Sequence, residues 1–551
     1  MEGAGGQLIA AQMAKRPAED AVDVAPAKRA RREREQDHLS PLSDEILLRI
    51  LSNLSVQQLN TCQRISRRFK RIAGDSQLWK AAYHDRFVRP RILRLSSRRT
   101  QSNETTASKP LRFMTEDETT KKSSGVHWKN QYKTRHNWAR GSCGVSEISM
   151  SSRQETPAML ARLHNGIVYT VDAVAGLRAW SYKSDRALLA TRRLNCEGQQ
   201  GVPTAIALAC ETTLQSQRIA VGYTDGSFSI FTYDTEDKVF AESCQGMASS
   251  GSKITALALS DLYLLCMNES QVLSLFRLPQ SSPGPAQDLS LLVSLMSQTA
   301  WPPLSLSIRP RGESILASIA YCMPTYTAGW SVGVQELLFS ETGSVLESRL
   351  ACAAGQGFTS LARDPRPVPR GAGAQNGDHE ASSAPSLRPT SLSYSHPYLL
   401  VSHSDNTMTL YMVTSTRAHL TVSAGRTLWG HTSSIFNAQV GGRGKAVSVS
   451  ARGDEIRIWE LEGGIRRRAS YGEDLQEASI QVTPERKKPV SADLDSFNAA
   501  TTRRVGLGLS MGTLPDSIAI TRGWVGFDDE AVVLLREQQA GSQALTIYDF
   551  S

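Results

Sequence analysis

Side chains that could perform chemistry are present in this chain, but they are not arranged in a known catalytic pattern. The chain has 10 histidines and 8 cysteines, and it contains neither a CxxC pair nor an HExxH zinc motif. It also lacks the GxxxxGK[ST] loop that cradles nucleotide phosphates. The sequence therefore predicts no catalytic residue, no metal and no cofactor, and we expect a protein that is not an enzyme.

One histidine has a spacing that indicates a structural hydrogen-bond network. In residues 430–461, a Gly-His pair ends at His431, and Trp459 follows after 27 further residues. The stretch resembles a WD repeat, whose histidine, second-strand serine, turn aspartate and tryptophan form a buried network. The resemblance implies that His431, Ser450 and Trp459 form it here. The turn position that holds aspartate in that family is a glycine, with Asp454 beside it.

The elements that would carry this network are short strands in repeated units. Apolar runs alternate with Gly, Asp, Asn and Ser turns in seven units, which begin near residues 160, 203, 253, 303, 389, 430 and 518. A period of 35–50 residues is typical of propeller blades. We therefore predict an all-β, WD-repeat-like propeller over residues 144–551, with disordered inserts near 355–388 and 463–514. In the WD-repeat family a terminal strand often closes the ring.

A different pattern precedes the strands, in residues 42–87. Ser43 is a good helix N-cap, and Ser55 with Gln58 three residues later predicts a capping box. Apolar side chains recur at helical spacing through the stretch. Fewer than fifty residues bury so much apolar surface poorly, which indicates a small helical module with a partner.

The helical stretch resembles an F-box, the module that docks onto the adaptor subunit of SCF-type ubiquitin ligases. Its pattern of Leu-x-x-Glu-Ile-Leu, Ile-Leu-x-x-Leu, Ser-Arg-x-Phe and Leu-Trp is present, with Ser43 in place of the usual proline. The resemblance implies contacts with the adaptor. The candidate adaptor-binding residues are Leu42, Ile46, Leu47, Ile50, Leu51, Leu54, Leu59, Cys62, Ile65, Phe69 and Trp79.

The remaining segments are a tail and a linker. Residues 1–38 have the composition of a disordered tail, 39–90 form the F-box, and 91–143 form a linker with a disordered insert and a Trp-rich connecting helix. Two basic clusters in the tail resemble a bipartite nuclear localisation signal and predict a nuclear and cytoplasmic protein. The residues of this signal are Lys15, Arg16, Lys28, Arg29, Arg31 and Arg32.

Together, the two resemblances imply an α+β multidomain protein, a small all-α F-box followed by an all-β propeller. They imply the substrate-recognition subunit of an SCF-type cullin-RING ubiquitin ligase, which docks the adaptor and, through it, the cullin and RING subunits. The propeller would bind the target protein for ubiquitination and degradation. Some relatives read phosphorylated targets with arginines, because guanidinium matches phosphate. The candidate target-binding residues are Arg178, Arg452 and Arg457.

An alternative reading is a nuclear propeller scaffold that binds protein or nucleic acid without assembling a ligase. Residues 40–140 hold 21 Lys/Arg and only 8 Asp/Glu, which is the kind of charge that nucleic acid attracts. The aromatic interleaving of single-strand binders is absent, so we do not expect nucleic acid as a partner. No membrane is expected either, because no apolar run reaches eighteen residues. Ser470 and Thr483 match short kinase-site patterns.

Overall fold

The computed structural model describes the helical region, the strands and many of the loops that join them. The described residues are 39, 41–90, 127–151, 159–183, 187–194, 201–209, 216–248, 251–279, 289–297, 301–324, 330–353, 389–416, 419–441, 444–461, 479–484, 524–537 and 543–551. The chain divides into two compact units, Met1–Leu78 and Trp79–Ser551.

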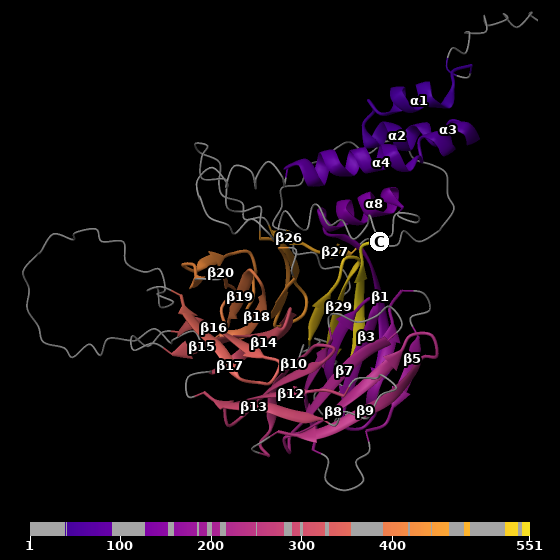
Figure 1. The fold of residues 1–551 in the computed structure, drawn as a ribbon. Helices are drawn as coiled ribbons and strands as arrows, with labels where there is room; N and C mark the ends of the chain where they lie inside the picture. Colours follow the sequence, from indigo (N-terminus) through magenta and orange to yellow (C-terminus); the bar gives the residue numbers. More distant parts are fainter. Residues whose placement is uncertain are drawn as a thin grey trace, which may run out of the picture. The chain divides into compact units, whose positions relative to one another are not determined.

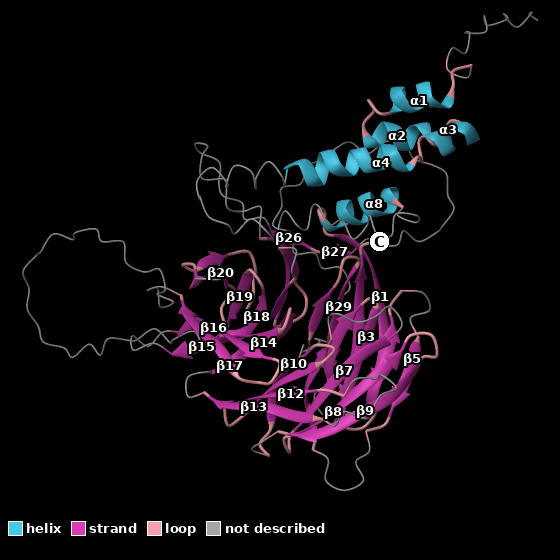
Figure 2. Cartoon of the chain, viewed as in Figure 1, coloured by secondary structure: helices cyan, strands magenta, loops and turns pink. Residues whose placement is uncertain are grey.

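Short helices make up the N-terminal part of the described chain (Figure 2). They are α1 (Asp44–Leu51), α2 (Val56–Cys62), α3 (Arg67–Ile72), α4 (Ser76–Tyr83), the π-helix η1 (His84–Val88) and α8 (Trp128–Trp138). Serines cap the first three of these helices. Ser43 accepts from the Ile46 amide at 3.5 Å, and Ser55 and Gln58 form the reciprocal capping box at 3.4 and 2.8 Å.

The strands form seven antiparallel sheets, which are the blades of a propeller (Figure 1). Blades 1 to 3 contain β2 (Leu160–His164), β3 (Ile167–Asp172), β4 (Gly176–Ser181), β5 (Leu188–Arg192), β6 (Pro203–Leu208), β7 (Ser216–Tyr223), β8 (Ser227–Asp234), β9 (Val239–Met247), β10 (Ile254–Leu259), β11 (Tyr263–Asn268), β12 (Val272–Arg277) and β13 (Ser290–Met296). Blades 4 and 5 contain β14 (Trp301–Arg311), β15 (Ser314–Pro324), β16 (Trp330–Ser340), β17 (Val345–Cys352), β18 (Pro389–Ser395), β19 (Tyr398–His403), β20 (Met408–Ser415), β21 (Leu420–Val422) and β22 (Arg426–Leu428). Blades 6 and 7 contain β23 (Ile435–Val440), β24 (Lys445–Ser450), β25 (Ile456–Glu460), β26 (Ser479–Gln481), β28 (Val525–Phe527), β29 (Ala531–Glu537), β30 (Gln543–Asp549) and β1 (Ser142–Ser151).

The first strand of each blade lies on the inside of a closed ring. The strands β2, β6, β10, β14, β18, β23 and β28 each contact the next one in this order, and β28 contacts β2. The ring is closed by β1, which pairs antiparallel with β30 and so completes the sheet of blade 7. Closure joins the two ends of the propeller in one sheet. The predicted fold class, a small helical region followed by a seven-bladed propeller, is confirmed.

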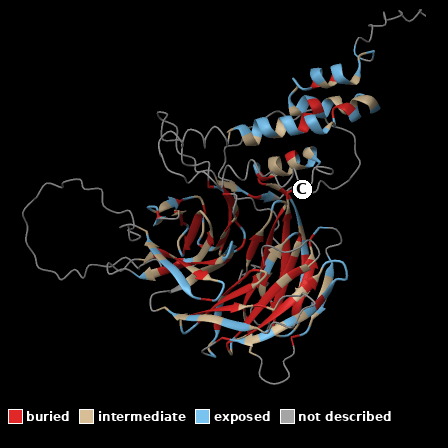
Figure 3. Cartoon of the chain, viewed as in Figure 1, coloured by how far each residue is buried: buried red, intermediate tan, exposed pale blue. Residues whose placement is uncertain are grey.

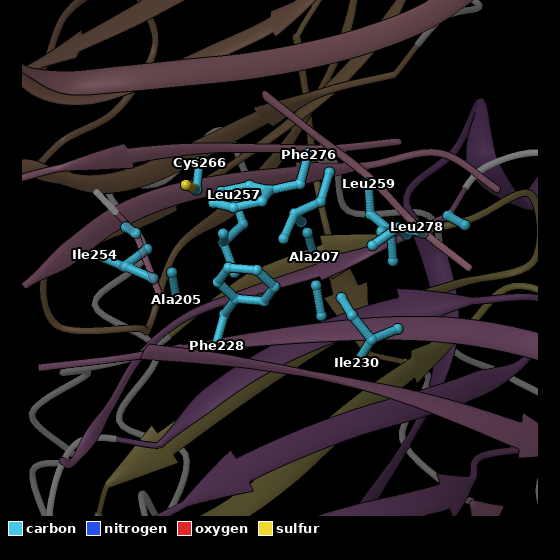
Figure 4. Close-up of a cluster of buried hydrophobic side chains, with 14 residues drawn as sticks. Ala205, Ala207, Phe228, Ile230, Ile254, Leu257, Leu259, Cys266, Phe276 and Leu278 are labelled. Carbon is cyan, nitrogen blue, oxygen red and sulfur yellow. The ribbon is translucent and has the colours of Figure 1, made fainter. Parts of the chain in front are cut away.

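Apolar side chains fill the space between neighbouring blades (Figure 3). Between blades 2 and 3, for example, Phe228 and Phe276 meet edge to face with ring centroids 4.9 Å apart (Figure 4). The third strand of every blade contributes a buried aromatic residue. These residues are Trp180, Phe231, Phe276, Phe339, Tyr411, Trp459 and Tyr548. A recurring large ring at one level of each blade gives the repeated units a common core.

Several sequence expectations concern residues outside the described part of the chain. They are the basic clusters of the tail at residues 15–32, the insert at 355–388 and Ser470. The expected disordered insert at 463–514 requires a correction. Ser479–Gln481 form β26 and Thr483–Pro484 form β27, because Ile480 pairs with Ile458 on the outer side of blade 6. Thr483 is exposed on β27, which runs parallel to the start of β1.

Candidate functional site: an exposed apolar face on the helical module

The strongest candidate site is an exposed apolar face on the first helices. Ile46 and Ile50 are one turn apart on α1, and they are 50% and 41% exposed. Ile65, between α2 and α3, is 64% exposed. Isoleucine side chains gain free energy when they are removed from water, so these three residues are suited to contact a partner. We call Ile46, Ile50 and Ile65 the docking face.

Other residues that we predicted to bind the adaptor are buried inside the chain itself. Leu47, Leu51 and Leu59 are at most 3% exposed, and Trp79 is 2% exposed. Their prediction as direct adaptor contacts was wrong, because helical spacing does not distinguish a helix face that meets a partner from one that meets its own core. Their role is to hold the helices together. The half-buried members of the predicted set are Leu42, Leu54, Cys62 and Phe69.

An ion-pair cluster fixes the start of α1 against α3. The Asp44 carboxylate lies 2.7 Å from Arg68 and 2.6 Å from Arg71, and Arg68 also donates to the Leu42 carbonyl oxygen at 2.5 Å. The hydrogen bond from Arg68 lowers the pKa of Asp44. Asp44 also lies in the first helical turn, where the helix dipole favours a negative charge. The cluster therefore sets the orientation of the helix that carries Ile46 and Ile50.

The connecting helix α8 carries aromatic side chains along its length. Tyr132 is buried, its ring meets Trp79 edge to face at 5.6 Å, and its hydroxyl accepts from Arg86 at 2.6 Å. Trp128 meets Tyr83 at 5.6 Å. The first two turns of α8 therefore pack against the segment from Trp79 to Phe87.

The end of α8 is anchored in the propeller. The Trp138 ring stacks on Phe550 with centroids 4.2 Å apart, and its indole nitrogen donates to the Asp529 carbonyl oxygen at 2.9 Å. The Asn137 amide donates to the Phe550 carbonyl oxygen at 2.9 Å, and the Lys445 ammonium lies 3.9 Å from the Trp138 ring centroid. Helix α8 thus joins directly to blades 6 and 7.

The predicted network in blade 6 exists, with one change of residue. The hydroxyl of Ser448, not Ser450, accepts from the Trp459 indole at 2.7 Å and lies 2.6 Å from His431 Nε2. Our assignment of Ser450 was wrong by one strand period of two residues, since Ser448 shares a face with Trp459. Glu455 supplies the acid, 3.3 Å from His431 Nδ1. Burial lowers the pKa of His431, so the ring is neutral near pH 7.

Blade 1 repeats part of this network without a histidine. The Trp180 indole donates to the Thr170 hydroxyl at 3.0 Å, and Thr170 is paired with Arg178 as Ser448 is paired with Arg457. Sequence reasoning missed Thr170. The aromatic residue near the end of each third strand is the signal that could have placed it, since the hydroxyl lies two residues from the partner of the tryptophan.

Two of the three predicted target-binding arginines are committed to their own blades. Arg178 is buried and pairs with Asp172 at 2.7 Å. Arg457 pairs with Glu455 at 2.6 Å and donates to the Ser479 hydroxyl at 3.0 Å. Their prediction as target contacts is not supported, because their charges are satisfied within the fold. Arg452, in the turn between β24 and β25, is exposed.

Two further findings bear on chemistry. No group of three or more His, Cys, Asp or Glu side chains within the described ranges is placed to hold a metal ion. None of the helices in those ranges is long and apolar enough to cross a membrane.

Comparison with known proteins gives matches to both parts of the chain. An F-box-like family model matches residues 44–85. A second model, the F-box protein pof12 beta-propeller, matches residues 143–551. The chain is 22% identical over 460 residues to F-box protein pof12 of Schizosaccharomyces pombe (strain 972 / ATCC 24843), which covers 82% of this chain and 90% of that protein.

Solved structures of similar shape are WD40 propellers. The C-terminal WD40 domain of Sif2 is 11% identical with a TM-score of 0.36, and the match covers 73% of this chain and 84% of that one. Saccharomyces cerevisiae Sqt1 is 9% identical with a TM-score of 0.38, covering 73% and 97%. These two likenesses are too distant to inform function. The family model, in contrast, spans most of the chain and begins where the first strand of the propeller begins. The chain therefore belongs to the F-box protein pof12 β-propeller family.

Proposed function

We propose that this protein is the substrate-recognition subunit of an SCF-type cullin-RING ubiquitin ligase. The observation that carries the proposal is the docking face, three exposed isoleucines on an F-box-like module. The cullin and RING subunits would be reached through the adaptor. The propeller would bind the protein that is ubiquitinated and degraded.

The proposed mechanism is proximity, without bond chemistry by this chain. A target held on the propeller experiences a high effective concentration of the ubiquitin thioester carried by the conjugating enzyme. This role requires a surface for the adaptor and a separate surface for the target. The architecture of an F-box-like module followed by a propeller supports that division.

The adaptor contact is tested by titration calorimetry of the full chain with a purified SCF adaptor subunit. The test variant is the double substitution Ile46→Asp, Ile50→Asp. The matched control is Leu350→Asp, because Leu350 on β17 is 58% exposed and lies outside the helical module. We expect the double variant to lose at least about a hundredfold in affinity, since each buried apolar contact is worth about tenfold or more.

The control should bind like the wild type, and circular dichroism should show that both variants keep their helices. Equal affinity of the double variant and the wild type would overturn the assignment of the docking face. A folded wild-type chain that does not bind any adaptor would overturn the ligase function as a whole.

The proposal includes a nuclear as well as a cytoplasmic location, carried by the two basic clusters of the tail. Fluorescence microscopy of the tagged full chain tests it. Replacement of Lys28, Arg29, Arg31 and Arg32 by alanine should remove the nuclear signal. An unchanged distribution would contradict a role of these clusters in import.

A further inference from the structure

An arginine on the innermost strand of blade 1 stands apart from the other charged groups of the propeller. Arg162 is in the middle of β2 and is exposed, although its strand neighbour Ala161 is buried. Both faces of this blade are covered by other blades. Ala161 belongs to the cluster shared with blade 7, and Leu160 packs on the cluster shared with blade 2. Solvent therefore reaches Arg162 through the central channel, which the seven first strands surround.

The surroundings of Arg162 offer its charge no compensation. Its one recorded hydrogen bond goes to the carbonyl oxygen of Ala161, at 3.1 Å, and no carboxylate within the described ranges forms an ion pair with it. Surrounding protein lowers the pKa of its guanidinium by desolvation, and no acid offsets this. Arg178 and Arg457, by comparison, each have an acid within 2.7 Å.

The channel wall has no acidic residue of its own. The seven first strands contain no Asp or Glu. Their other arginines, Arg309 and Arg311, lie at the hairpin end of β14, opposite Leu316 and Ser314. In a channel with low-dielectric walls, one uncompensated cation attracts anions more strongly than it would on an open surface.

We infer that Arg162 is an anion-binding residue in the central channel and receives a carboxylate or phosphate group of the protein that the propeller binds. The planar guanidinium can donate two parallel hydrogen bonds to either group. This inference rests on the proposed receptor function and specifies one contact with the target. It also replaces the predicted contacts at Arg178 and Arg457 with a residue whose donors are available.

Thermal unfolding of the full chain distinguishes an anion site from a structural arginine. The variants are Arg162→Met and Arg162→Lys, with Arg452→Met as the control in an exposed turn. In chloride, Arg162→Met should melt about 2–4 °C higher than the wild type, because it removes a desolvated charge that nothing compensates. In phosphate or acetate at equal ionic strength, the wild type and Arg452→Met should gain stability and Arg162→Met should not.

A lower melting temperature of Arg162→Met in chloride, or equal anion effects in Arg162→Met and wild type, would overturn the inference. An array of extended peptides then identifies the source of the anion, with phosphoserine, Asp or Asn at the central position. Binding of the phosphoserine or the Asp series should fall about tenfold in Arg162→Met and less in Arg162→Lys. Binding that does not depend on Arg162 in either series would contradict the inference.

Adaptor titration separates failure of this inference from failure of the proposed function. Arg162→Met should bind the adaptor as the wild type does, because the docking face is on α1 and near α3. Loss of adaptor binding by this variant would point to general misfolding, and the Arg162→Lys result would then decide the inference: an anion effect weaker than that of the wild type supports it, and an unchanged effect overturns it.

Discussion

The helical module and the propeller treat apolar surface differently. In the propeller, the aromatic residues of the third strands are at most 7% exposed, because each blade is covered by its neighbours around a closed ring. In the module, α1 buries Leu47 and Leu51 but leaves Ile46 and Ile50 in contact with solvent. A small helical unit has two few-residue faces and only one core to cover them. The comparison teaches that the ring satisfies its own surface, whereas the module is complete only with a partner.

The largest expected effect breaks this comparison at adjacent residues of one helix. Leu47→Asp should unfold the module, because it removes a buried leucine, about 2–5 kcal/mol, and adds the cost of burying a carboxylate. Ile46→Asp, on the exposed side, should leave the helices folded. Far-ultraviolet circular dichroism and limited proteolysis of the full chain compare the two variants.

The propeller should melt at the same temperature in both variants, since residues 1–78 form a separate unit. If Ile46→Asp unfolded the module as completely as Leu47→Asp, the distinction between the docking face and the core would be wrong.

The next effect concerns the helix that enters the propeller. Trp138→Ala should cost about 3–5 kcal/mol of propeller stability, because Trp138 stacks on Phe550 and donates to the Asp529 carbonyl oxygen. Urea unfolding followed by fluorescence measures this cost. Trp128→Ala is the control, because Trp128 lies at the other end of α8, against Tyr83. A smaller effect of Trp138→Ala than of Trp128→Ala would contradict the anchoring of α8 through its end.

A third prediction uses the buried histidine of blade 5. Burial lowers the pKa of His403 to about 4, below the ordinary value of about 6.5. Between these values the unfolded chain binds more protons than the folded one, so stability is full above pH 6.5 and falls as the pH drops towards 4. The loss should be about 3 kcal/mol at pH 4.

Urea midpoints from pH 7 to pH 4 measure this dependence. His403→Gln should flatten it, and His419→Gln, at an exposed site on blade 5, should leave it unchanged. An identical slope in His403→Gln and wild type would show that His403 is not the group that titrates.

The smallest effect sharpens the comparison between two blades. Trp459→Phe should cost about 1–3 kcal/mol, because it removes the indole hydrogen bond to the buried Ser448 hydroxyl. Trp180→Phe removes the equivalent bond to Thr170 in blade 1 and should cost less, since Thr170 holds no histidine. Thermal unfolding of both variants tests the order, and a larger cost for Trp180→Phe would contradict it.

The fold was predictable from the sequence because its signals are local. Seven strand-and-turn units predict seven blades, and the serine caps predict the helices of the module. Blade 6 in particular keeps both His431 and Trp459 at a spacing that few other folds require.

The candidate sites were predicted less well, because they depend on which face a side chain occupies. Ser448 and Ser450 lie on one strand, and only the register with Trp459 shows which of them reaches the indole. Ile46 and Leu47 are equally apolar, and only tertiary packing exposes one and buries the other. Arg162 carries no motif at all, since its environment is made by six other blades.

The most direct test of the central claim is sedimentation velocity of the full chain mixed with adaptor, cullin and RING subunits. The proposed function predicts one complex that contains all four proteins, and loss of this chain from the complex when Ile46 and Ile50 are replaced by Asp. A folded wild-type chain that sediments alone beside an intact adaptor–cullin–RING complex would contradict the claim.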